Sequence, residues 1–480
     1  MIGALIDLIP WVREGPGWAI IVTLLAIAGA GSTLVWRDNA ALKRFAALAI
    51  WIGILTILLL ALRGRISDEP IALSALAEGK SSIIVGAGIA LVGLLAWLLG
   101  GVAAISETRR QIVAPLIFIL AASSFGAITA SDLLVLMIWQ VAIGGSVLGF
   151  VLLLRQPGEA DAARALMMIE AICLIGTGVA LAMLGTAPSA SPGPGPAGIG
   201  IGVLLITLIG RLIGFTLALP LVARAKEPVL AAEVAVAGIA IPATLLTLVA
   251  VIERFDALLP QALNLILAIS ACVLMLLAAG FAIGVRGRGA RIAAVAASLI
   301  GLAVLGACEG AKTSLLFVLL WFGPVPAFLA ASSIAGRIDR GGAHITPQSL
   351  TPQVDAIALL LAVASLALIG LPPFAGFWAR LLLIEAAWAR ADYAIIAVTL
   401  LSSLVLAFAL SRRTFEHVPA TAGIERRNRA PGIALPELLV LGVMSGLSIA
   451  GGLYPAPFLA MSDKAPTDGA IMQAELTEQR

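Results

Sequence analysis

The sequence predicts an all-α polytopic membrane protein, with about 14 transmembrane helices. Hydrophobic residues make up 61% of the 480 residues, charged residues only 12%, and the mean hydropathy is +1.09. That charged share is about half the usual value for a soluble domain, so the chain has too little polar surface to cover itself in water. The 49 glycines suit helices that approach one another closely in a bilayer. An ordinary soluble domain, a disordered chain and a disulfide scaffold are therefore excluded.

The predicted spans are apolar runs that reach the length of about 20 residues needed to cross a bilayer. They are longer than the strands of a membrane barrel and do not alternate as such strands do. The run 354–389 is counted as one span that is broken in its middle. The runs are 17–36, 45–62, 81–105, 112–130, 133–154, 164–186, 198–222, 229–252, 258–285, 291–307, 313–335, 354–389, 393–411 and 434–457.

Lysine and arginine give an independent test of this count. With the N-terminus outside, the inner loops hold roughly twice as many lysines and arginines as the outer segments, as the positive-inside rule requires. The most basic inner loop is 412–433, whereas the outer loop 186–197 is uncharged. We therefore expect a multi-pass protein of a bacterial-type inner (cytoplasmic) membrane, surrounded by lipid, with both termini on the outer face. The net charge of +3 is explained by these loops and does not indicate nucleic-acid binding.

Cysteine and histidine are too few and too scattered to build a metal or cofactor site. Cys173, Cys272 and Cys308 lie far apart in apolar runs, and the two histidines, His344 and His417, lie in polar loops. The glycine-rich stretch 284–291 has no strand before it, so it does not form a dinucleotide fingerprint. We expect no metal, no cofactor and no redox chemistry within this chain.

Two spans carry helix-breaking residues. The seventh contains Pro220, and the twelfth contains Pro372 and Pro373 between Gly370 and Gly376. Proline removes a backbone donor, and in lipid the freed carbonyl must find another partner. We therefore expect helices 7 and 12 to be broken. The two breaks are five spans apart, which suggests two five-helix repeats of inverted orientation.

This spacing divides the chain into four predicted units. The first holds three helices, the next two are the repeats, and the last holds the basic loop, the final helix and a polar tail. Their boundaries are 1–111, 112–257, 258–411 and 412–480.

Ionisable residues inside spans cost roughly 2.5–3.5 kcal/mol each on insertion scales, so each is a candidate for an ion or proton path. Arg211 has two possible partners, Glu170 and Glu233. Arg380 directly follows the break in the twelfth span and, as an arginine, is a poor proton carrier. The candidates are Glu170, Arg211, Glu233, Glu309, Lys312, Arg380 and Glu385. No catalytic residue in the enzymatic sense is expected.

The stretch GLPPFAGFWARLLLIEAA resembles the twelfth-span signature of the antiporter-like membrane subunits of respiratory complex I. In that family two prolines and a Gly-Phe pair precede a lysine or a glutamate. Residues 121–154 resemble the family's fourth and fifth spans, and GFTLALPLVARAKEPVLAAEVAVAG its seventh and eighth. The resemblance covers roughly residues 110–410. The family also includes subunits of multisubunit cation/proton antiporters, membrane-bound hydrogenases and inorganic-carbon uptake complexes.

The positions that match the family's proton relay hold other residues here. The resemblance implies a glutamate in span five and lysines in spans seven and eight, where this chain has Gln140, Thr216 and Gly238. It implies histidine and lysine in span eleven, where the chain has Gly323, Pro324 and Pro326. In span twelve the family's lysine or glutamate is Arg380. Glutamine and threonine do not exchange protons near neutral pH.

Three functions stay open on this evidence. The first is a membrane subunit of a complex-I-like, NADH-quinone oxidoreductase-type assembly that translocates protons, with other membrane and hydrophilic subunits as partners. The second is a structural or coupling subunit of a related assembly that does not conduct. The third is an independent secondary transporter in which Arg211 and Arg380 hold a small anion.

Overall fold

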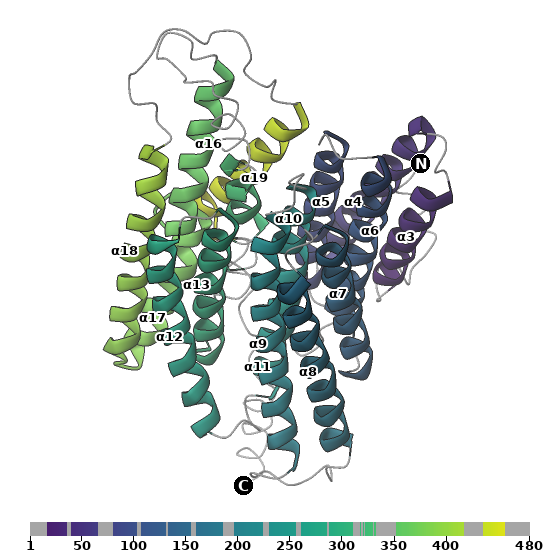
Figure 1. Cartoon of the computed structure of the whole chain (residues 1–480). Helices are drawn as coiled ribbons and strands as arrows, with labels where there is room; N and C mark the ends of the chain where they lie inside the picture. The colour runs from purple at the N-terminus through teal and green to yellow at the C-terminus, as the bar shows by residue number, and fades with distance from the viewer. Residues whose placement is uncertain are drawn as a thin grey trace.

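The computed structural model describes residues 17–35, 40–65, 80–102, 107–130, 133–154, 160–185, 196–223, 230–255, 261–285, 288–310, 317, 320, 322–329, 331–332, 352–416 and 435–456. Every regular element in these ranges is a helix, so the all-α prediction is confirmed for the part of the chain that is described. The helices lie side by side, with α3 (Gly17–Val35) and α4 (Ala40–Arg65) at one flank and α18 (Tyr393–Glu416) at the other (Figure 1).

The first half of the chain continues from α4 into a tightly packed group of helices. In the middle of this group, α10 passes through a short π-helix, η2, into α11. The elements are α5 (Lys80–Val102), α6 (Glu107–Thr129), α7 (Leu133–Leu154), α8 (Ala160–Gly185), α9 (Pro196–Ala223), α10 (Leu230–Ala235), η2 (Val236–Ala240) and α11 (Ile241–Phe255).

The second half packs against the first through α13, which contacts α9 and α11. Its elements are α12 (Gln261–Gly284), α13 (Arg288–Cys308), α16 (Pro352–Ile369), α17 (Ala375–Ala389), α18 and α19 (Leu435–Leu453). The described helices follow the predicted spans closely. Ten helical segments of the described chain are long and apolar enough to cross a membrane. The total of about 14 spans and the inverted repeat stay predictions.

The break predicted at Pro220 is wrong. α9 runs without interruption from Pro196 to Ala223 with Pro220 in its last turn. A proline there costs one backbone hydrogen bond, which neighbouring helices can compensate in a membrane protein.

The irregular turn in this half is η2, which the apolar pattern of the sequence does not predict. It ends directly before Ile241 and Pro242, the start of α11. A proline ring clashes with the carbonyl four residues earlier, here that of Gly238, and a widened turn relieves the clash. Pro242 could therefore have indicated the widened turn. It lies within the continuous apolar run 229–252, however, and such a run predicts one unbroken helix.

Residues 370–374 separate α16 from α17, with a cis peptide between Pro372 and Pro373. Gly370 has a φ of +82°, a conformation that glycine adopts without strain. Its N–H donates to Ala367 O, at 3.2 Å, and the Leu371 N–H donates to Leu366 O, also at 3.2 Å. These two bonds form a Schellman motif, which terminates α16.

Candidate functional site

Gln140 on α7 lies at the position where the resemblance implies a glutamate, and it belongs to a neutral hydrogen-bond network. Its Nε2 donates to Thr247 Oγ1 at 2.8 Å, and its Oε1 accepts from Thr244 Oγ1 at 3.0 Å. Thr247 in turn donates to Ala243 O. All three side chains are buried, and together they join α7 to α11. The network consists of amide and hydroxyl groups, which carry no charge at neutral pH.

The two lysine positions of the resemblance are also filled by residues without charge. Thr216 donates to Ile213 O, within its own helix. Gly238 lies in η2, where an added Cβ would come 2.6 Å from Val92 Cγ1 and 3.0 Å from Pro326 Cγ. η2 therefore packs directly against α5 and against the segment that contains Pro326, with no room for a longer side chain.

We predict that Gly238→Ala destabilises the protein by about 1–3 kcal/mol, the usual cost of overpacking a close-packed core. The branched Val92 side chain is short and cannot turn away from the new methyl group. Gly280→Ala on α12 is the matched control, because nothing lies within 4 Å of an added Cβ there. Thermal unfolding of both variants in the same detergent measures the difference. Equal midpoints for the two variants would contradict the packing at η2.

Arg211 pairs with Glu170, which settles the alternative left open by the sequence. Arg211 Nε lies 3.2 Å from Glu170 Oε2, and the two side chains are 2% and 9% exposed. The pair joins α9 to α8. An added Cβ at Gly144 on α7 would come 2.5 Å from Glu170 Oε2, so this glycine gives the carboxylate its space. Gln140 lies one turn away from Gly144 on the same helix. The neutral network at Gln140 and the Arg211–Glu170 ion pair therefore meet α7 at positions one turn apart.

Arg380 is buried at the junction of α16 and α17. Its Nη2 donates to Leu368 O at 2.8 Å, and its Nη1 donates to Gly376 O at 3.2 Å. Leu368 O is one of the terminal carbonyls of α16 that the Schellman motif leaves without a partner. Arg380 forms no ion pair with a described carboxylate, but it faces the negative end of the α16 dipole. The guanidinium therefore joins the two half-helices.

Two other candidates in the described residues differ in burial. Glu233 is fully buried in α10, and Glu385 is exposed on α17. Lys312 lies outside the described residues. Among the described candidates, the structure pairs Glu170 with Arg211 and places Arg380 on backbone carbonyls.

Glu309 follows the last residue of α13, outside the span Gly289–Cys308, and it pairs with Arg390 at the end of α17. Arg390 Nη1 lies 3.2 Å from Glu309 Oε2. Burial raises the pKa of the Glu309 carboxyl, and Asp392 raises it further, while Arg390 lowers it. Because burial is the largest of these causes, the folded protein binds a proton at Glu309 more readily than the unfolded chain does.

This raised pKa predicts the sign of a pH effect. The native state gains stability relative to the unfolded state as the pH falls from neutral toward 4.5, the ordinary glutamate value. That contribution is lost again as the pH rises through the pKa of folded Glu309. Glu309→Gln cannot titrate, so its thermal midpoint should lack this part of the pH dependence. Parallel pH profiles for the wild type and Glu309→Gln would contradict the assignment.

Residues 198–406, which run from α9 into α18, match the family model described as NADH:quinone oxidoreductase/Mrp antiporter, TM. Residues 198–406 are therefore similar to an antiporter-like membrane domain. The resemblance inferred from the twelfth-span motif is thereby confirmed.

A curated relative supports the antiporter-like assignment over a shorter stretch. NADH-quinone oxidoreductase subunit N 2 of Solidesulfovibrio magneticus is 28% identical over 173 residues. The match spans 35% of this chain and 35% of that protein.

Solved structures resemble this chain over nearly its whole length. A chain of the Mrp complex from a Dietzia species has a TM-score of 0.73 at 16% identity, covering 93% of this chain and 96% of that one. A chain of the archaeal membrane-bound sulfane sulfur reductase has a TM-score of 0.76 at 18% identity, covering 94% and 97%. A chain of respiratory complex I from Thermus thermophilus with bound NADH has a TM-score of 0.64 at 18% identity, covering 92% and 97%. At these identities the likeness shows the fold alone.

Proposed function

We propose that this chain is a membrane subunit of a multisubunit respiratory-type assembly, in which its antiporter-like fold supports and couples neighbouring subunits without carrying protons along the family's relay. The solved structures with this fold come from multisubunit membrane complexes, which favours other subunits as partners. The redox chemistry of such an assembly belongs to those partners. We further propose the inner-membrane location, the termini on the outer face, and the four units with boundaries at 111, 257 and 411.

The observation that carries this proposal is the contact set of Arg380. A proton carrier must gain and lose its proton near neutral pH, and arginine stays charged in proteins. Arg380 donates to Leu368 O and Gly376 O, so it acts as a clamp, a side chain that connects the two half-helices α16 and α17. The neutral partners of Gln140 and the closed space at Gly238 support the same conclusion for the first half of the chain.

The same contacts weigh against the independent anion transporter. Such a transporter would need Arg211 or Arg380 to face a substrate. Arg211 Nε is engaged by Glu170, and Arg380 donates to backbone carbonyls. The conducting subunit is the stronger alternative, since Glu170 and Glu233 are buried acids within predicted spans.

Gentle affinity purification of the tagged chain from its native membrane, followed by mass spectrometry, tests the subunit assignment. Recovery of hydrophilic respiratory subunits together with other antiporter-like subunits is the expected result. A monomer or a homo-oligomer would overturn the assignment. Transport of a small anion by that species would replace it with the independent transporter.

A further inference from the structure

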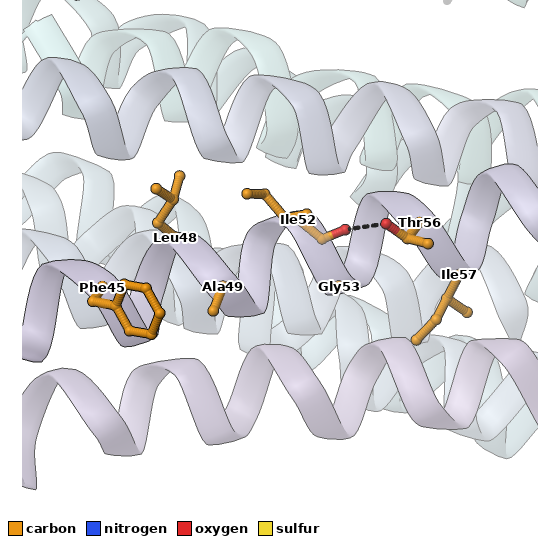
Figure 2. A pocket seen from close by; sticks show the side chains of 7 residues that line it. All are labelled: Phe45, Leu48, Ala49, Ile52, Gly53, Thr56 and Ile57. Carbon is orange, nitrogen blue, oxygen red and sulfur yellow. Dashed lines mark hydrogen bonds between the residues drawn. The ribbon is translucent and has the colours of Figure 1, made fainter. Parts of the chain in front are cut away.

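α4 carries an open apolar groove that the proposed function does not use. Figure 2 shows the described part of its lining, all of which lies on this helix. The groove has a volume of about 470 Å³, within the range of small-molecule sites. Its lining residues are Phe45, Leu48, Ala49, Ile52, Gly53, Thr56 and Ile57.

The chemistry of the lining fits a hydrocarbon chain. Ala49 and Gly53 are the smallest side chains of the set, and an added Cβ at Gly53 would meet nothing within 4 Å. Among the described lining residues the one hydroxyl is that of Thr56, which donates to Ile52 O at 2.8 Å, so its donor is already used (Figure 2). The groove therefore offers an occupant dispersion contacts and no free hydroxyl donor.

The length of the groove fits one acyl chain. Its lining runs from Phe45 to Ile57, which is about 18 Å along a helix. The hydrocarbon core of a bilayer is about 30 Å thick, so this length matches one leaflet. One acyl chain occupies one leaflet, so the groove has about the length of an acyl chain.

Basic residues lie at one end of the groove, near the end of α4 where a headgroup would sit. Lys43 and Arg44 directly precede Phe45, and Arg44 is exposed. Basic side chains next to a membrane helix attract anionic lipid headgroups, each by a modest amount. Positive charge at one end and a leaflet-long apolar groove beyond it complement the two parts of an anionic phospholipid.

We propose that α4 binds an anionic phospholipid, with the phosphate at Arg44 and one acyl chain along Ala49 and Gly53. If the predicted orientation holds, this lipid belongs to the inner leaflet. The site keeps a lipid on the flank of the molecule that α3 and α4 form (Figure 1).

Photolabelling tests the acyl part of the site. The assembly is extracted from its membrane and placed in nanodiscs of equal phosphatidylglycerol and phosphatidylcholine, with a trace of phosphatidylglycerol that carries a photoreactive acyl chain. Labelling along residues 45–57 should exceed that on the exposed apolar face of α12. Gly53→Leu places a large side chain in the groove and should reduce labelling of residues 45–57 to the level of α12. Gly178→Leu is the control, because it adds the same side chain at another glycine with open space. Labelling on α4 that never exceeds that on α12 would show annular lipid only and overturn the proposal.

The headgroup is tested by swapping which lipid carries the photoreactive chain. Arg44→Gln should lower the preference for phosphatidylglycerol over phosphatidylcholine about fivefold, the factor expected for one basic residue near a charged surface. Arg164→Gln is the control, because Arg164 is an exposed arginine on α8 that pairs with Asp161. An unchanged preference in Arg44→Gln would overturn the site. Loss of a partner subunit in Gly53→Leu with unchanged lipid labelling would also overturn it and assign the groove to a partner helix.

Discussion

Arg380→Glu is expected to cost about 3–5 kcal/mol of stability and to prevent assembly, the usual effect of leaving a buried charge without compensation. The new carboxylate would face the carbonyl end of α16 and could not donate to Leu368 O, which Arg380 bonds at 2.8 Å. The resemblance makes this a sharp test, because the family itself uses glutamate or lysine at this position. A residue that works as a clamp needs a donor, whereas a relay residue needs a proton that can leave.

Arg380→Lys is the conservative variant, because an ammonium keeps the charge and a donor but loses the planar fork. It should retain assembly with a reduced thermal midpoint. Glu385→Gln, at an exposed position of the same helix, should leave the free energy of unfolding within about 0.5 kcal/mol of the wild type. Thermal unfolding and size-exclusion profiles in one detergent measure both effects. Normal assembly and stability of Arg380→Glu would disprove the clamp.

Arg211→Gln is the second large effect, with an expected loss of about 3–5 kcal/mol because Glu170 would be left as an uncompensated buried charge. The double replacement Glu170→Gln with Arg211→Gln should recover much of that loss, since it leaves no uncompensated charge at the site of the pair. A double-mutant cycle on thermal midpoints gives the coupling between the two side chains. Additive losses in the double variant would show that the pair at 3.2 Å contributes nothing as a pair.

The spans could be predicted from the sequence because a bilayer demands long apolar runs with few charges. The predicted run 133–154 coincides with α7, and 198–222 lies within α9. Local irregularity was harder to predict. Pro220 sits in a continuous helix, while η2 precedes Pro242, because neighbouring helices decide whether a proline can be accommodated.

The candidate site was only partly predictable for a similar reason. Burial of Glu170, Arg211 and Arg380 follows from their positions in apolar spans, but their partners depend on packing between helices. The Schellman motif at Gly370 leaves a carbonyl for Arg380, and the Gly-Pro-Pro stretch could have indicated a helix terminus with such a need. The role of Gly144 could not be predicted from the sequence, because this glycine leaves space for the Glu170 carboxylate, which lies on another helix.

The central claim is that protons do not pass through the buried acids of this chain. The most direct measurement is proton translocation per turnover by the purified assembly in liposomes, compared between the wild type, the Glu170→Gln and Arg211→Gln double variant, and Glu233→Gln. We expect the same proton yield per turnover from every variant that assembles. A lower yield from an intact assembly that carries either change would contradict the claim and identify the neutralised acid as part of a conducting path.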